Sequence, residues 1–130
     1  MIPSNEATLR EPIEFSGVGL HTGRPARVRV SPAATGHGVR FRLNDAADFA
    51  ARIDALVDTS RATVLGWGKH RVSTVEHLLS ALVGTGVSNA LIAVDGPEIP
   101  ALDGSAAPFV DAIDAAGIED QGIARAVFAP

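Results

Sequence analysis

Two segments in the first third of the chain alternate strictly between apolar and charged residues. They read ARVRV at 26–30 and VRFRL at 39–43. A period of two is typical of a strand with one buried face, so each segment predicts a strand. The intervening residues 31–38 contain one proline and two glycines, which predicts a hairpin loop that joins the two strands.

Shorter apolar runs predict further strands on either side of this pair. Ile13 and Phe15 flank Glu14 ahead of a glycine-rich stretch, which indicates a strand. Residues 50–58 form an apolar patch that predicts one short strand. Residues 62–73 predict a second hairpin, with Gly-Trp-Gly at its tip.

The clearest helical pattern covers residues 74–83. Its apolar residues follow the spacing i, i+3, i+4, i+7 and i+8, which forms one stripe along a helix; they are Val75, Leu78, Leu79, Leu82 and Val83. Ser73 and Glu76 have the spacing of a capping box. Gly84 and Gly86 supply a signal for the end of the helix.

The last third of the chain predicts one strand and one helix. Residues 90–94 form a continuous apolar run, typical of a strand buried on both faces or nearly so. A proline-stiffened segment follows at 96–100. A second helix is expected over residues 105–116, with Pro108 in its first turn and Gly117 at its end.

This order of elements predicts an α+β fold, a two-layer sandwich in which two helices cover one face of a mostly antiparallel sheet. We expect the domain to occupy residues 1–123. Residues 124–130 read ARAVFAP and have the pattern of a strand that begins there. They are therefore expected to start a linker toward a further domain.

Composition narrows the class of protein. A chain of 130 residues has the size of one domain, and 46% apolar with 20% charged residues excludes a disordered chain. The lack of cysteine excludes a disulfide scaffold, an iron–sulfur site and a thiol nucleophile. A net charge of −4 without any tyrosine disfavours nucleic-acid binding. No stretch resembles a transmembrane segment or a secretory signal, so we expect a cytoplasmic protein.

The adjacent residues Glu76 and His77 are the most informative candidates for chemistry. On a helical wheel His77 points away from the apolar stripe and Glu76 lies on its flank. One interpretation is a solvated histidine beside a capping-box glutamate. The other is an imidazole that binds a metal, with a carboxylate that takes a proton from water on that metal. A catalytic zinc needs about three protein ligands, and spacing alone supplies no complete set.

Two further residues have a structural and a functional interpretation. Asp103 precedes the second helix, where an Asx turn or a cap is expected; alternatively, its carboxylate orients an imidazole or the base. His21 lies among glycines in a loop, where it either contacts a ligand or is a surface residue.

Three motifs resemble the LpxC family, the zinc-dependent UDP-3-O-acyl-N-acetylglucosamine deacetylases of lipid A (lipopolysaccharide) biosynthesis. They read GVGLHTG at 17–23, STVEHL at 73–78 and PEIPALDGSAAPF at 97–109. The resemblance runs from about residue 9 to residue 118. It implies two similar α+β domains with the active site between them.

By the same resemblance, His77 is a ligand of one Zn²⁺ ion and Glu76 is the general base. Asp103 matches an acidic active-site position, and His21 matches a histidine in the substrate region. The other zinc ligands, a catalytic histidine and the acyl-chain tunnel belong to the family's second domain.

We therefore expect this chain to be a first half that is inactive alone. Its expected partners are the UDP-linked acylated glucosamine and a missing second domain or a second copy. The alternative is a single-domain relative that acts as a non-catalytic binding or self-pairing module.

Overall fold

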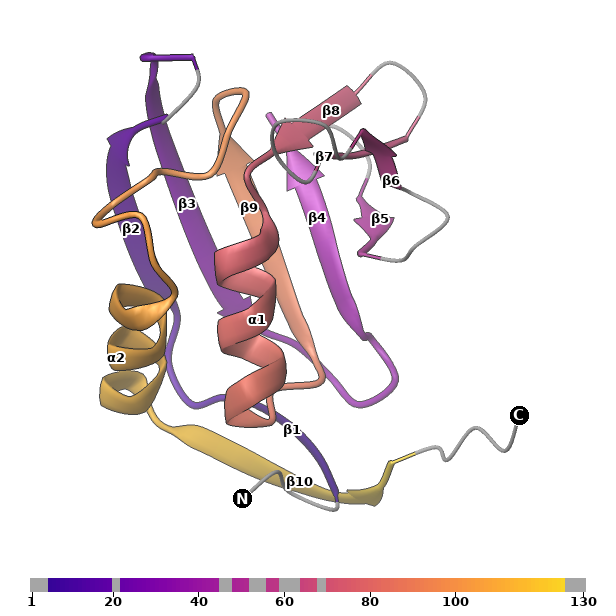
Figure 1. The fold of residues 1–130 in the computed structure, drawn as a ribbon. Helices are drawn as coiled ribbons and strands as arrows, with labels where there is room; N and C mark the ends of the chain where they lie inside the picture. The colour runs from indigo at the N-terminus through magenta and orange to yellow at the C-terminus, as the bar shows by residue number, and fades with distance from the viewer. Residues whose placement is uncertain are drawn as a thin grey trace.

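A five-stranded sheet lies at the centre of the computed structural model, which describes residues 5–19, 22–44, 48–51, 56–58, 64–67 and 70–125 (Figure 1). Its strands in spatial order are β2 (Ile13–Val18), β3 (Pro25–Pro32), β9 (Ala90–Asp95), β4 (Val39–Leu43) and β5 (Phe49–Ala50). Neighbouring strands are antiparallel except β9 and β4, which run parallel.

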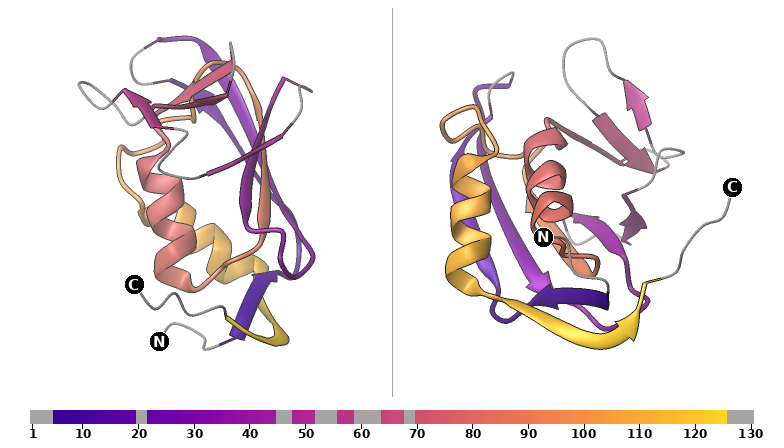
Figure 2. Two further views of the ribbon diagram at one scale, coloured as in Figure 1. Left: turned by 90° about the vertical axis from the view of Figure 1, so that its right-hand side faces the viewer. Right: turned by 60° about the horizontal axis from the view of Figure 1, so that its bottom comes forward.

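Two helices, α1 (Glu76–Thr85) and α2 (Ala107–Ala116), cover one face of this sheet, and the left view of Figure 2 shows the two layers edge-on. The predicted α+β fold, with two helices on one face of a mostly antiparallel sheet, is confirmed. Within the described ranges, neither helix is long and apolar enough to cross a membrane.

Two smaller sheets lie at opposite ends of the helices in Figure 1. The antiparallel pair β1 (Asn5–Leu9) and β10 (Ile118–Ala124) lies at the lower end. The antiparallel strands β6 (Leu56–Asp58), β7 (Val64–Trp67) and β8 (His70–Ser73) lie at the upper end, directly before α1.

The core fills the space between the five-stranded sheet and the helices. Alternate residues of each central strand point into it, as their period of two predicts. The fully buried side chains include Val28, Val30, Phe41, Ile92, Leu78, Leu82, Phe109 and Ile113. The Phe15 ring packs edge-on against Phe109, with ring centroids 4.8 Å apart, and so joins β2 to α2.

The predicted hairpin between residues 26–30 and 39–43 is wrong. Both segments are strands, but β9 lies between them and forms hydrogen-bonded ladders with each. Alternation identifies the buried face of a strand and not its neighbour. β9, the most apolar of the five strands, occupies the centre of the sheet, with β3 on one side and β4 on the other.

Residues 50–58 do not form one strand. Residue 50 ends β5 in the large sheet, whereas residues 56–58 form β6 in the three-stranded sheet. The hairpin predicted over 62–73 is confirmed as β7 and β8. Gly66 and Trp67 lie within β7, paired with residues of β8, so the predicted tip is wrong for these two; residues 68–69 lie outside the described residues.

The helix predicted over 74–83 begins at Glu76 and extends to Thr85. Thr74 has a φ of 61°, a left-handed conformation that cannot continue a helix. Val75 is the N-cap, without a side-chain hydrogen bond, so the capping box is wrong. The stop at Gly86 is confirmed by its φ of 89°, whereas Gly84, predicted as part of the same stop, lies within the helix. Val83 is 66% exposed, so the apolar stripe does not include it.

The second helix begins at Ala107, two residues later than predicted, and ends at Ala116 as predicted; Pro108 lies in its first turn and Gly117 caps it. The β9 strand buries one face completely, whereas Leu91 and Ala93 on the other face are only half-buried. The prediction that β9 is buried on both faces is therefore only partly right. The strand β10 begins at Ile118, earlier than the strand expected from residue 124; residues 126–130 lie outside the described residues.

Candidate active site

Three loops that carry the motif residues meet at one end of the large sheet, the upper end in Figure 1. They are the loop after β2, the connection from β8 to α1, and the connection from β9 to α2. The main-chain N–H of Ala101 donates to the carbonyl of Val18 at 3.1 Å and so ties the first loop to the third. Residues far apart in the sequence are thereby brought to one place.

Glu76 and His77 are the first two residues of α1, and both side chains are half-buried. The Oε2 atom of Glu76 is buried without a hydrogen-bond partner in the described part of the chain. A helix N-terminus stabilises a carboxylate, because the main-chain N–H groups of the first turn point toward it. A buried acceptor of this kind is suited to a partner that comes from outside these residues.

Asp103 forms the Asx turn that the sequence predicts before α2. Its Oδ1 atom accepts hydrogen bonds from Ser105, at 2.9 Å from the main-chain N–H and 2.7 Å from the hydroxyl. These hydrogen bonds, that of the hydroxyl first, hold the pKa of the Asp103 carboxyl below its usual range, and the charge of His77 acts in the same direction. The imidazole of His77 and the carboxylate of Asp103 therefore lie within electrostatic reach of each other.

His21 lies outside the described residues, so its predicted place beside the substrate stays a prediction. The loop around it is anchored on both sides. Gly19 donates its N–H to the carbonyl of Arg24, and Gly23 donates to the carbonyl of Gly19, each at 3.0 Å. These bonds hold Gly19 close to Gly23 and Arg24 at the end of β2.

Sequence reasoning missed Glu98, which is fully buried at 0% exposure. Its carboxylate accepts hydrogen bonds from Thr22 and from Thr74. The only sequence signal is a glutamate enclosed by Pro97 and Ile99 in an otherwise apolar segment. Glutamate is rarely buried without partners, so such a position suggests a charged group held inside a network.

The described residues contain no cluster of three histidine, cysteine, aspartate or glutamate side chains that could hold a metal ion. His77 is thus a candidate for one ligand, with Asp103 nearby and Glu76 adjacent in the sequence.

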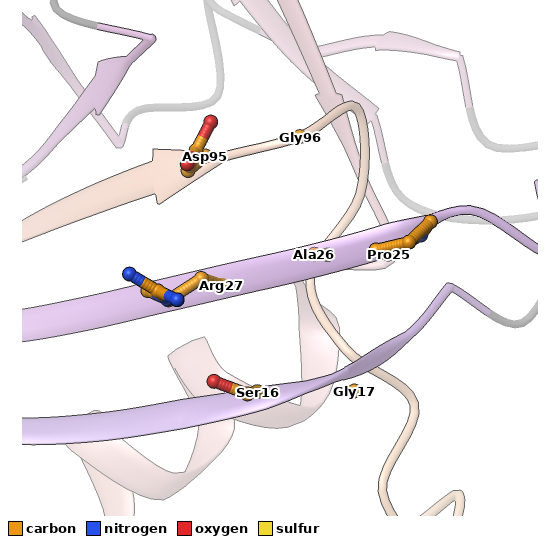
Figure 3. A pocket seen from close by; sticks show the side chains of 7 residues that line it. All are labelled: Ser16, Gly17, Pro25, Ala26, Arg27, Asp95 and Gly96. Carbon is orange, nitrogen blue, oxygen red and sulfur yellow. The ribbon is translucent and has the colours of Figure 1, made fainter.

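A surface cavity of about 280 Å³ lies between β2, β3 and the end of β9 (Figure 3). Ser16, Arg27 and Asp95 line it from three neighbouring strands, and Arg27 is the register partner of the other two. Glu76, His77 and Asp103 do not line this cavity. It is therefore not the predicted site.

The chain matches the family model described as LpxC, UDP-3-O-acyl N-acetylglycosamine deacetylase, over residues 6–129. A curated relative from Anaeromyxobacter sp. (strain Fw109-5) is 46% identical over 122 residues, which cover 93% of this chain and 40% of the relative. A relative from Geobacter sp. (strain M21) is 45% identical over 123 residues, which cover 92% of this chain. A relative from Methylococcus capsulatus is 46% identical over 119 residues, which cover 89% of this chain. All three relatives are named UDP-3-O-acyl-N-acetylglucosamine deacetylase.

This chain spans about 40% of the length of the relatives that it matches. The matched region includes all three loops that meet at the upper end of the sheet, and both helices behind them. A match over residues 6–129, together with the α+β fold, shows that the chain belongs to the LpxC family.

Proposed function

We propose that this chain carries one half of the active site of a zinc-dependent UDP-3-O-acyl-N-acetylglucosamine deacetylase, an amide hydrolase of lipid A biosynthesis. The observation that carries the proposal is the Glu76 carboxylate, whose Oε2 atom is buried without a hydrogen-bond partner among the described residues. It is adjacent in the sequence to a half-buried imidazole, His77, which lies within electrostatic reach of Asp103. A base, a metal ligand and an orienting carboxylate are the groups that such a hydrolysis needs.

The residues present fit a shared zinc site rather than a complete one. His77 would supply one nitrogen ligand, since neutral imidazole suits zinc. When bound, zinc lowers the pKa of a water ligand and polarises the amide carbonyl. The remaining ligands would come from a second domain, which the 40% coverage of the relatives supports, or from a second copy of this chain.

Glu76 would act as the general base. Its Oε2 atom accepts the proton of the attacking water as the C–N bond of the N-acetyl group is hydrolysed to acetate and a free amine. The N-terminus of α1 stabilises the ionised form of this carboxylate, which is the form that accepts a proton. No other described side chain competes for Oε2 through a hydrogen bond.

Asp103 would orient the His77 imidazole. Like an ordinary aspartate, Asp103 is ionised at neutral pH, and the two hydrogen bonds from Ser105 that lower its pKa also fix the direction of the carboxylate. A carboxylate beside a metal-ligating imidazole typically fixes the ring orientation. For His21 we propose contact with the substrate, and for the protein a cytoplasmic location, both on the family resemblance.

The proposal is tested by joining this chain to the part of the Anaeromyxobacter relative that lies beyond the matched region. We expect this chimera to release acetate from UDP-3-O-acyl-N-acetylglucosamine in the presence of zinc, and the 130-residue chain alone to release none. Glu76→Gln in the chimera should lower kcat by about 10²- to 10⁴-fold, the usual contribution of a general base.

Glu14→Gln, on an exposed position of β2, serves as the matched control and should leave kcat unchanged. Turnover by the isolated chain, or a Glu76→Gln chimera as fast as its parent, would contradict the proposal.

A further inference from the structure

Glu98 is a buried carboxylate that the proposed chemistry does not use. It lies between β9 and α2 and is fully buried, together with its neighbour Ile99. Moving a carboxylate out of water is costly unless hydrogen bonds compensate it. The contacts of this side chain therefore indicate why it is there.

The Glu98 carboxylate connects all three loops of the candidate site. Its Oε1 atom accepts hydrogen bonds from the main-chain N–H and the hydroxyl of Thr22, both at 3.2 Å, in the glycine-rich loop. Its Oε2 atom accepts a hydrogen bond of 2.5 Å from the hydroxyl of Thr74, in the connection to α1. One side chain thus holds together segments that lie 76 and 24 residues away in the sequence.

The Thr74 end of this network lies directly before the N-cap of α1. Thr74 is buried at 5% exposure and adopts a φ of 61°. A left-handed conformation is unfavourable for a residue with a Cβ atom, so the surrounding contacts must hold it. The turn at Thr74 sets the direction in which α1 leaves β8, and Glu76 and His77 follow within three residues.

Gly19 shows that the carboxylate is closely surrounded. A Cβ atom at Gly19 would lie 1.9 Å from Oε1 of Glu98 and 2.7 Å from the hydroxyl of Thr22. Only a residue without a side chain allows the glycine-rich loop to approach the carboxylate this closely. Glycine at 19 and glutamate at 98 are therefore parts of one arrangement.

We propose that Glu98 is a positioning residue that acts through Thr74, and that it fixes the first turn of α1 so that Glu76 and His77 point into the active site. This inference rests on the proposed function for its catalytic consequence. Its structural part, the control of the α1 start by the carboxylate, is measurable without catalysis.

The experiment compares Thr74→Val and Thr74→Ser with Thr85→Val. Valine at 74 removes the hydroxyl that donates a hydrogen bond to Glu98, and serine keeps that hydroxyl. Thr85 is the matched control because its hydroxyl also makes a hydrogen bond, to Ala81 at the other end of α1. None of these residues touches the reacting atoms.

The first measurement is the NMR spectrum of the 130-residue chain. We expect Thr74→Val to shift the amide resonances of Glu76 and His77, while Thr74→Ser and Thr85→Val leave them near their original positions. Unshifted amides of Glu76 and His77 in Thr74→Val would overturn the inference, because the start of α1 would then not depend on the carboxylate.

The second measurement is the kinetics of the chimera. A misplacement of about 1 Å can cost about 100-fold in rate, so Thr74→Val should lower kcat by roughly 10- to 100-fold while KM changes little, and Thr74→Ser should restore kcat. Equal losses of kcat in the valine and serine variants, or a loss that follows thermal stability alone, would overturn the positioning role. Failure of the proposed function would show separately, because the Glu76→Gln chimera would then be as active as its parent.

Discussion

Replacing Gly19 by alanine places a methyl group on the Glu98 carboxylate. The new Cβ atom would lie 1.9 Å from Oε1 of Glu98, whereas real contacts of this kind do not fall below 3.0 Å. The carboxylate or the loop must therefore move by about 1.1 Å, a change typical of an overpacked core. The hydrogen bonds of Glu98 with Thr22 and Thr74 are the first contacts that such a movement breaks.

The expected magnitude follows from those contacts. A hydrogen bond to a charged group contributes about 1.5–3 kcal/mol, and overpacking costs about 1–3 kcal/mol. Alanine in place of glycine restricts the unfolded chain, which raises the free energy of unfolding by about 0.4–1 kcal/mol and offsets part of this loss. We expect Gly19→Ala to lower the free energy of unfolding by about 3 kcal/mol, measured by urea denaturation of the chain.

Gly84→Ala is the matched control. Gly84 lies within α1, and a Cβ atom there would meet no heavy atom within 4 Å. Alanine in the helix should raise the free energy of unfolding by about 0.5–1 kcal/mol. A Gly19→Ala chain as stable as its parent would contradict this expectation, because the carboxylate would then have more room than the structure gives it.

Two other predictions concern the core and the Asx turn. Leu82→Ala should lower the free energy of unfolding by about 3 kcal/mol, because Leu82 is fully buried, whereas Val83→Ala, at a 66% exposed position, should change it by less than about 0.5 kcal/mol; urea denaturation compares them. The lowered pKa of Asp103 stabilises the fold above the unfolded pKa of about 4, and this contribution is lost as pH falls through the lower folded value. Asp103→Asn should therefore lose less stability than the parent chain between about pH 5 and about pH 2. Asp114→Asn, on the exposed face of α2, should match the parent. An identical acid dependence of Asp103→Asn and the parent would contradict the role of the Asx turn.

The sequence pattern predicted the buried faces of the strands and the presence of both helices, since hydrophobic periodicity depends on local burial. It did not predict that β9 lies between β3 and β4, because alternation within a strand shows its buried face and not which strand pairs with it. It placed the start of α1 two residues early. The left-handed turn at Thr74 that decides this start is held by Glu98, 24 residues further along the chain.

The candidate site was predictable to a similar extent. The adjacency of Glu76 and His77 and the Asx turn of Asp103 follow from local sequence. The structure brings Asp103 within electrostatic reach of His77. Glu98 was not singled out, because a glutamate between two apolar residues gives no periodic signal. Its partners lie in two other loops, so only the folded chain shows what it does.

The proposal that His77 binds zinc as part of a shared active site is tested most directly by the zinc content of the chimera after dialysis. We expect about one zinc ion per chain in the parent and a loss of bound zinc in His77→Ala. His37→Ala, in the loop before β4, should retain the parent's zinc. A His77→Ala chimera that binds zinc as fully as its parent would contradict the proposed role of this residue.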